Sequence, residues 1–117
     1  MKKILIVGAG GQIGSELTGY LRNIYGGANV IAADLRHNDM LAGDGPFIQL
    51  DVLDRDRLAY AVHKNNVDTI FNLVALLSAT GEKNPQLAWN INMGALNNSL
   101  EVAREYNCAV FTPSSIG

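Results

Sequence analysis

The sequence predicts an α/β domain built on a doubly wound parallel sheet of about five strands in the order 3-2-1-4-5. Three observations support this prediction. Apolar runs of strand length alternate with stretches of helical periodicity along the chain, a glycine-rich turn follows the first run, and small or polar residues follow the later ones. Strands that alternate with helices form right-handed βαβ units, so their strands lie parallel in one sheet.

The first predicted strand is the apolar run Ile4 to Val7, which enters the glycine turn. Apolar residues at positions 13, 17, 21 and 24 then predict a helix, and Gly26-Gly27 ends it. The second strand is predicted over residues 29–33. Residues 37–46 are polar and rich in turn-forming types, so a loop is expected there.

The second half of the chain repeats the alternation. A short third strand, 47–50, precedes Asp54, the expected N-cap of a helix over 55–64 that Asn65-Asn66 closes. The fourth strand, 67–74, is almost continuously apolar, which is typical of a strand covered on both faces. Asn84-Pro85 fits the N-cap and first residue of a helix to about Tyr106, and the fifth strand spans 109–112.

The helix over 85–106 carries more apolar surface than one core-facing stripe requires. Its apolar residues form two lines, at positions 87, 91 and 95 and at positions 96, 100 and 103. We therefore expect it to bury a second face, against a partner chain or against an element outside these residues.

Composition and charge restrict the class of protein. The chain has 117 residues, 48% hydrophobic and 17% charged, which suits one globular domain, and its net charge of −2 argues against a nucleic-acid or membrane-surface partner. No apolar run reaches the ~18 residues of a membrane span. Lys2-Lys3 and the apolar run after it resemble a signal peptide, but the run is too short. We expect a cytoplasmic protein, or a matrix protein whose leader has been removed.

The single cysteine, Cys108, excludes an internal disulfide and fits a reducing compartment. Because it stands just before an apolar strand, we expect a small core residue and not a reactive thiol. His37 and His63 are isolated in the sequence, so no spacing of metal ligands is present and no metal site is expected.

The glycine turn carries the main indication of function. Glycines at 8, 11 and 14 form the pattern G-x-x-G-x-x-G, whereas G-x-G-x-x-G fails because position 13 is Ile. Glycines let the backbone approach phosphate groups, and the free N–H groups of the first helical turn point at them. The pattern predicts a site for the pyrophosphate of a dinucleotide, with a plain glycine turn as the alternative.

Asp34 strengthens the dinucleotide interpretation. It ends the second apolar run, twenty residues after Gly14, where the adenosine ribose hydroxyls need an acceptor. Its charge should repel a 2′-phosphate and so favour NAD over NADP, although Arg36, two residues later, can accept such a phosphate. The alternative is a solvated loop carboxylate. The carboxyl ends of the other predicted strands also supply small or polar residues, at Asp51, at 75–78 and at Ser114-Ser115.

Two further segments resemble one group of proteins. The segments are Leu76 to Trp89, with the sequence LLSATGEKNPQLAW, and Thr112 to Gly117, with the sequence TPSSIG. Both are similar to the extended short-chain dehydrogenases that act as NAD-dependent L-threonine 3-dehydrogenases. The resemblance covers the whole chain but only the N-terminal part of the family. It implies a Rossmann-like fold, with residues 1–117 forming an incomplete NAD-binding domain. The sequence departs from the family at Asn90, where Asp is expected, which puts local capping in doubt.

The resemblance also implies roles for individual residues. The pyrophosphate would be held by Gly8, Gly11, Gln12, Ile13 and Gly14. The adenosine end would be held by Asp34 with Leu35 and Arg36 beside it, and by Asp51 and Val52, which would flank the adenine. The middle of the cofactor would be lined by Leu73, Ala75 and Leu76, and Asn92 would steady the turn after the fourth strand. Ser78 and Ser115 would contact the substrate or its reacting hydroxyl, Ser115 as a catalytic residue.

The implied reaction is oxidation of the L-threonine 3-hydroxyl to 2-amino-3-ketobutyrate, with hydride transfer to NAD. The family's base is a Tyr with a Lys four residues later, on a helix after the fifth strand, where this chain ends. The single match in the sequence, Tyr60 to Lys64, lies on the helix between strands three and four and fits an amphipathic surface helix. We therefore expect a fragment, a truncated frame or part of a split enzyme that is inactive alone.

Because the helix over 85–106 takes part in a dimer interface in the family, a homodimer or larger self-association is expected.

Two other functions stay open. A different oxidoreductase or isomerase of the same superfamily, such as a sugar-nucleotide epimerase or dehydratase, would share the glycines and Asp34. The segment from Leu76 to Trp89 argues against it. A non-catalytic module that senses NAD would explain the absence of the Tyr/Lys pair.

Overall fold

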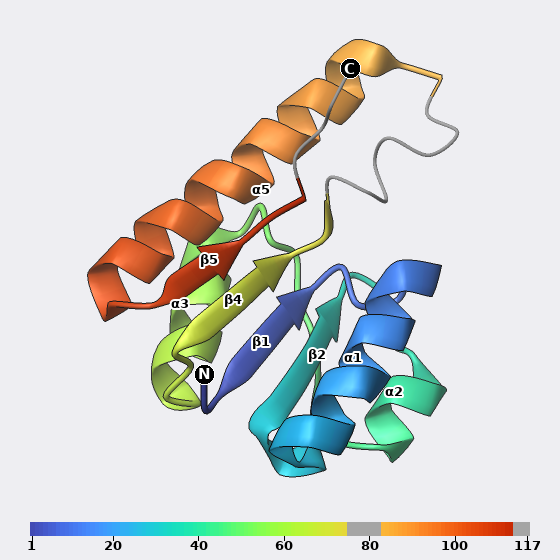
Figure 1. Cartoon of the computed structure of the whole chain (residues 1–117). Coiled ribbons are helices and arrows are strands. Elements are labelled where there is room, and N and C mark those ends of the chain that lie inside the picture. Colours follow the sequence, from blue (N-terminus) through green and yellow to red (C-terminus); the bar gives the residue numbers. More distant parts are fainter. Residues whose placement is uncertain (75–82, 114–117) are drawn as a thin grey trace.

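The computed structural model describes residues 1–74 and 83–113, and these form a five-stranded parallel sheet. The strands are β1 (Ile4–Val7), β2 (Val30–Asp34), β3 (Phe47–Gln49), β4 (Thr69–Asn72) and β5 (Ala109–Phe111). Their order is β3-β2-β1-β4-β5, so the predicted topology is confirmed. Strands β2 and β3 are added on one side of β1, and β4 and β5 on the other. This switch between β1 and β4 places the first β–α turn at the centre of one edge of the sheet (Figure 1).

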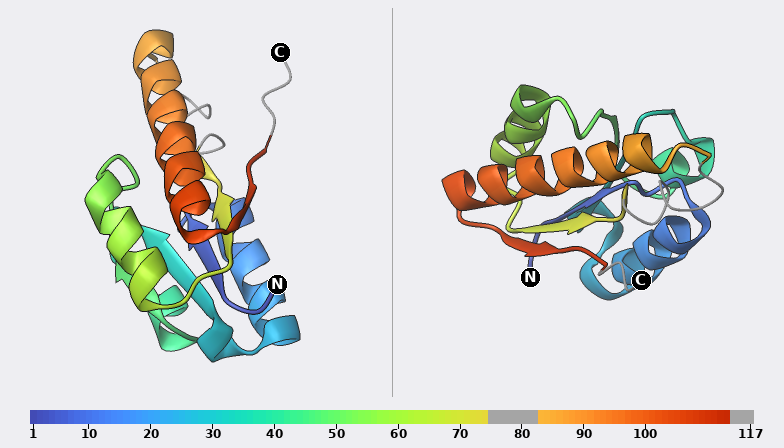
Figure 2. Two further views of the ribbon diagram at one scale, coloured as in Figure 1. Left: turned by 90° about the vertical axis from the view of Figure 1, so that its left-hand side faces the viewer. Right: turned by 90° about the horizontal axis from the view of Figure 1, so that it is seen from above.

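Helices cover both faces of the sheet. They are α1 (Gln12–Tyr25), α2 (Asp39–Gly43), α3 (Arg55–Lys64) and α5 (Pro85–Tyr106), with a 3₁₀ turn, η1 (Gly27–Asn29), before β2. Figure 2 shows α3 and α5 side by side on one face and α1 on the opposite face. The core therefore consists of two apolar layers, one on each side of the strands.

The central strand β1 shows how the sequence produces these layers. Side chains of a strand point alternately to its two faces. Leu5 and Val7 pack with residues of α3 and α5, and Ile4 and Ile6 pack with residues of α1 and α2. All four are almost fully buried, as the continuous apolar run predicts for a parallel strand covered on both sides.

The loop prediction for residues 37–46 is wrong in part, because the short helix α2 lies inside this segment. Asn38 caps it, with its side-chain oxygen accepting a hydrogen bond of 3.0 Å from the N–H of Leu41. Leu41 is buried against the α1 side of the sheet. One turn of helix thus forms around a single buried leucine, a contact that local composition does not reveal.

The helix predicted from positions 13, 17, 21 and 24 is confirmed as α1, but this spacing does not mark its buried side. Ile13 and Ile24 are more than half exposed, whereas α1 buries Gly14, Thr18, Leu21 and Arg22. The Arg22 guanidinium donates hydrogen bonds to the carbonyl oxygens of Val30, Leu41 and Pro46, at 3.2, 2.7 and 2.7 Å. Burial lowers the pKa of Arg22, while the nearby charge of Asp44 opposes that change. These bonds satisfy a buried cation and join α1 to β2 and to the segment before β3.

The remaining caps agree with the sequence. The side chain of Asp54 accepts a hydrogen bond from the N–H of Arg57, at 3.2 Å, and begins α3. Asn84 does the same for the N–H of Leu87, at 3.1 Å, at the start of α5. The fourth strand is shorter than predicted, 69–72 against 67–74, because only these residues continue the ladder with β1.

Cys108 behaves as a core residue. It is half-buried, packs against the α3 and α5 layer, and donates its S–H to the carbonyl oxygen of Val67 at 3.0 Å. Burial, and then the charge of Asp68, raise the pKa of the thiol. The nucleophilic thiolate is therefore disfavoured.

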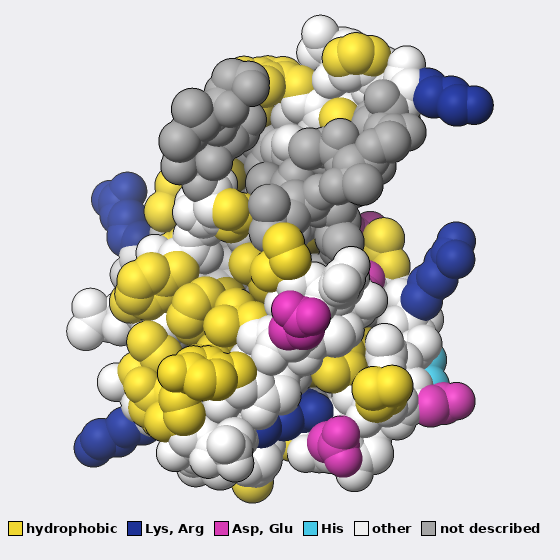
Figure 3. All heavy atoms as spheres, turned by 45° about the vertical axis from the view of Figure 1, so that its right-hand side comes forward, with side chains coloured by type: hydrophobic (Ala, Val, Ile, Leu, Met, Phe, Trp, Pro, Cys, Tyr) yellow, Lys and Arg dark blue, Asp and Glu magenta, His cyan; other side chains and the backbone are white. Residues whose placement is uncertain are grey.

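Among the described residues, no helix covers the α1 side of the sheet over β4 and β5 (Figure 2). Phe71 of β4 and Phe111 of β5 stack with their ring centroids 5.0 Å apart, and Phe111 is 48% exposed. Tyr20 and Ile24 of α1 are exposed as well, and Figure 3 shows hydrophobic side chains gathered on this side of the molecule. We call Tyr20, Ile24, Phe71 and Phe111 the open apolar face. Among the described helices, none has the length and apolar character to cross a membrane.

Candidate functional site

The glycine turn joins β1 to α1 at the carboxyl edge of the sheet. Gly8 has a φ of +80°, a conformation that glycine adopts without strain. The N–H groups of Gly8 and Ala9 donate to the carbonyl oxygen of Ala33, at 3.0 and 3.1 Å, which fastens the turn to β2. The chain then leads directly into the first turn of α1.

The N-terminus of α1 is suited to an anion. Gly11 is the N-cap and supplies no side-chain hydrogen bond, and the first helical residues Gln12 and Ile13 are exposed. Helix N–H groups without a cap, together with the helix dipole, attract phosphate. A Cβ at Gly14 would lie 2.6 Å from the carbonyl oxygen of Gly8, so only glycine permits this close approach of helix and turn. The pyrophosphate of a dinucleotide fits this cradle.

Asp34 ends β2 next to the glycine turn. Its Oδ2 accepts a hydrogen bond of 2.7 Å from the N–H of Gly10, and its Oδ1 accepts one of 2.7 Å from the N–H of Leu35. A carboxylate offers about four acceptor positions, so both oxygens can still accept from ribose hydroxyls. The backbone has already oriented the carboxylate for that role.

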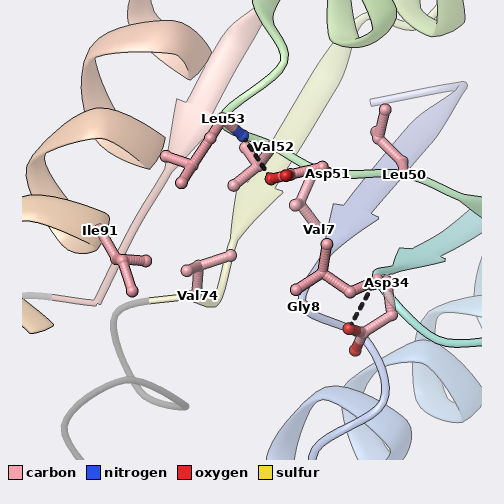
Figure 4. Close-up of a pocket in the computed structure, with 10 residues that line it drawn as sticks. Val7, Gly8, Asp34, Leu50, Asp51, Val52, Leu53, Val74 and Ile91 are labelled. Carbon is pink, nitrogen blue, oxygen red and sulfur yellow. Dashed lines mark hydrogen bonds between the residues drawn. The ribbon is translucent and has the colours of Figure 1, made fainter. Parts of the chain in front are cut away.

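A hollow of about 260 Å³ lies between Asp34 and α5 (Figure 4). Most of its wall is apolar, and the carboxylates of Asp34 and Asp51 are its acidic groups. Its lining comes from four strand ends and one helix: Val7, Gly8, Asp34, Leu35, Leu50, Asp51, Val52, Leu53, Val74 and Ile91. An apolar slot with one acidic end suits a flat aromatic base attached to a sugar.

A second hollow, of about 300 Å³, lies on the other side of Asp34. It is lined by Gly10, Gly11, Asp34, Leu35, Arg36, His37 and Asn38. Arg36 therefore lines this second hollow together with Asp34 and does not line the first one. The exposed ring of His37 lies 3.0 Å from a carboxylate oxygen of Asp39 and edge-on to Phe47.

The structure places two further predicted residues without testing their roles. The side chain of Leu73 is buried in the layer beneath α1, and the neighbouring residue Val74 lines the hollow. Asn92 lies on α5, where its Oδ1 is buried without a hydrogen-bond partner among the described residues. Both roles stay predictions. Ala75, Leu76, Ser78 and Ser115 lie outside the described residues.

Sequence reasoning missed several residues of the hollow. Val7, Leu50 and Leu53 are ordinary apolar residues in the sequence, and Ile91 belongs to an apolar helical line. Their part in the site depends on the sheet bringing strand ends together. Position next to the carboxyl end of a strand is the one signal that indicates Val7 and Leu50.

The Tyr60 to Lys64 match lies on α3 and is separate from this site. Tyr60 is exposed, and the Lys64 Nζ lies 5.5 Å from the centroid of its ring. Neither residue lines the hollow beside Asp34. The described part of the chain contains no group of three or more His, Cys, Asp or Glu side chains able to hold a metal ion.

Comparison with known proteins gives a consistent family. A family model described as the NAD dependent epimerase/dehydratase family matches residues 4–116. An uncharacterized epimerase/dehydratase from Staphylococcus aureus (strain USA300) is 56% identical over 119 residues, covering 100% of this chain and 37% of the relative. The chain thus spans 37% of the length of that curated relative.

Solved structures give the same fold at high similarity. An L-threonine dehydrogenase from Clostridium difficile superposes with a TM-score of 0.90 at 53% identity, covering 98% of this chain and 37% of that protein. An L-threonine dehydrogenase from Cupriavidus necator, in its holo form, gives a TM-score of 0.87 at 47% identity over 97% of this chain and 37% of its own.

Proposed function

The chain belongs to the NAD dependent epimerase/dehydratase family, and on this premise we propose that it is the NAD-binding part of an L-threonine 3-dehydrogenase. The observation that carries the proposal is the continuous site formed by the uncapped start of α1, Asp34 and the adjoining apolar hollow. The substrate is inferred from the two L-threonine dehydrogenases at 53% and 47% identity.

Each part of the site would have a distinct task. The α1 N–H groups after Gly11 would neutralise the pyrophosphate, and Asp34 would accept from the adenosine ribose hydroxyls. The hollow beside Asp51 and Val52 would take the adenine. The negative charge of Asp34 opposes a 2′-phosphate, so we propose NAD and not NADP, in spite of Arg36 nearby.

The proposed reaction converts the 3-hydroxyl of L-threonine to a ketone. Bound NAD would accept the hydride from the carbon that bears this hydroxyl, and a base would accept the hydroxyl proton. The resemblance assigns substrate contact to Ser78 and Ser115, and the base to a Tyr/Lys pair. Tyr60 and Lys64 lie on α3, separate from the NAD site, so we propose that this chain alone binds NAD without oxidising threonine.

The other candidate within the family is a sugar-nucleotide epimerase or dehydratase. The name of the curated relative, an uncharacterized epimerase/dehydratase, gives the family and leaves this candidate open. A non-catalytic NAD-sensing module would use the same hollow and the same Asp34. All three proposals require dinucleotide binding, and they differ in whether L-threonine leads to NADH.

The experiment has two steps. Titration calorimetry on the 117-residue chain should detect NAD binding that is at least about tenfold tighter than NADP binding. The chain is then fused to the C-terminal portion of the Clostridium difficile enzyme. NADH absorbance is followed with L-threonine, and conversion of a sugar nucleotide is followed by chromatography, because an epimerase or dehydratase regenerates NAD within each turnover and forms no net NADH. NADH formation with L-threonine supports the proposal. A folded hybrid that binds NAD but forms no NADH from L-threonine contradicts it.

A further inference from the structure

We infer that Asn98 is a positioning residue, which from α5 holds in place one wall of the hollow that we propose for the adenine. This inference rests on the proposed NAD site. The Asn98 side-chain Nδ2 donates a hydrogen bond of 2.9 Å to the carbonyl oxygen of Val52, 46 residues away in the chain. Val52 belongs to the segment between β3 and α3 that lines the hollow. A helix on the other side of the hollow thus holds the backbone of this wall.

Local hydrogen bonds shape this segment without fixing its distance from α5. The Oδ1 of Asp51 accepts from the N–H of Leu53 at 2.9 Å, and the carbonyl of Asp51 accepts from the N–H of Asp54 at 2.9 Å. Both bonds stay within one turn of the chain. The hydrogen bond from Asn98 joins the segment to α5, and it acts together with the packing of Val52 in the α5 layer and the ion pairs of Arg55 with Glu101 and Glu105. It is the contact that ties the backbone of Val52 itself to the helix.

A second contact from the same face of α5 supports the inference. Gly94 lies one turn before Asn98, and a Cβ built there would come within 2.8 Å of the Cδ2 of Leu53. The missing side chain gives Leu53 room against the helix. Ile91 lies three residues before Gly94 and lines the hollow itself, facing Leu53 and Val74 in Figure 4.

Ile91, Gly94 and Asn98, all on α5, thus contribute to the width of the hollow. A flat ring bound between apolar walls loses dispersion contacts when one wall moves outward by as little as 0.5–1 Å, roughly the gap that forfeits a quarter to a half of the attraction. Releasing Val52 should therefore weaken binding of the adenine part of a ligand. The phosphate cradle at α1 is built from a different segment and should keep its affinity.

The test compares Asn98→Ala with Asn97→Ala, an exposed asparagine on the same helix. Calorimetry uses NAD, AMP as the adenine-bearing probe and inorganic pyrophosphate as the probe without adenine. For Asn98→Ala we expect the Kd of NAD and AMP to rise about 5- to 30-fold, with the Kd of pyrophosphate within about twofold of the parent chain. Equal weakening of all three ligands, or binding equal to that of Asn97→Ala, overturns the inference.

Amide hydrogen exchange at Leu53 and Asp54 separates this inference from the proposed function. Faster exchange in Asn98→Ala than in Asn97→Ala supports the positioning role even if neither NAD nor AMP binds, in which case the proposed function is what fails. Unchanged exchange overturns the positioning role. If Asn98→Ala does not fold, Gly94→Ala replaces it. The added methyl group displaces Leu53 from the helix, so the affinity for NAD and AMP should fall while the affinity for pyrophosphate stays the same.

Discussion

The carboxylate of Asp34 accepts a hydrogen bond of 2.7 Å from the backbone N–H of Gly10, 24 residues earlier in the chain. This bond joins the end of β2 to the glycine turn after β1. The acid proposed to hold the ribose and the turn proposed to hold the pyrophosphate therefore form one unit. Movement of either part would change the distance between the two subsites.

Replacing Asp34 by Asn should weaken NAD binding. The amide keeps the shape but loses one acceptor and the negative charge that strengthens hydrogen bonds from ribose hydroxyls. We expect the Kd of NAD, measured by calorimetry, to rise about tenfold. The ratio of the Kd of NADP to the Kd of NAD should fall. Asp56→Asn is the control, because that side chain is almost fully exposed on α3. Unchanged NAD affinity in Asp34→Asn would show that the ribose lies elsewhere.

The two glycines of α1 should respond in opposite ways to alanine. A Cβ at Gly14 would lie 2.6 Å from the carbonyl oxygen of Gly8, whereas one at Gly19 would meet no atom within 4 Å. Gly14→Ala should lower the free energy of unfolding by about 1–3 kcal/mol through overpacking. Gly19→Ala should raise it by about 0.5–1 kcal/mol through helix propensity. Urea denaturation measures both, and equal changes would contradict the close contact at Gly14.

The strand order and the glycine turn could be predicted because local patterns determine them. Continuous apolar runs indicate buried parallel strands, and the spacing of Gly8, Gly11 and Gly14 between a strand and a helix favours a dinucleotide turn. The walls of the hollow could not be predicted, since Leu53 and Ile91 meet only when the sheet and α5 have formed. Arg22 was missed for the same reason, because its three carbonyl partners come from later segments of the chain.

Asp68 should contribute a pH-dependent part of the stability. Partial burial favours its neutral form, but hydrogen bonds from the Thr69 hydroxyl and the N–H groups of Lys2 and Lys3 outweigh that effect and lower the pKa of the carboxyl. A carboxyl whose pKa is lower in the folded state stabilises the protein above its unfolded pKa of about 3.9. The contribution is lost as the pH falls through the folded pKa.

Asp68→Asn should therefore be less stable than the parent chain by about 1 kcal/mol at neutral pH, a value reduced for solvent access. The difference should shrink as the pH falls below about 4. Urea denaturation across this range measures it, with the exposed Asp56→Asn as the control. If the difference in stability between Asp68→Asn and the parent chain stays constant at low pH, the shape of the side chain and not its charge explains the effect.

The open apolar face leads to our proposal that this chain self-associates. Phe111 lies on β5, the edge strand of the sheet that the described residues form, stacked on Phe71 and 48% exposed. Sheet edges beside apolar surface favour association between chains. Phe111→Lys should raise the dissociation constant at least about tenfold, because the new charge would have to be buried between copies. Met40→Lys is the control, since Met40 is a 74% exposed apolar residue on α2, outside the open apolar face. Sedimentation equilibrium measures both variants, and a parent chain that sediments as a 12.6 kDa monomer at all concentrations would refute self-association.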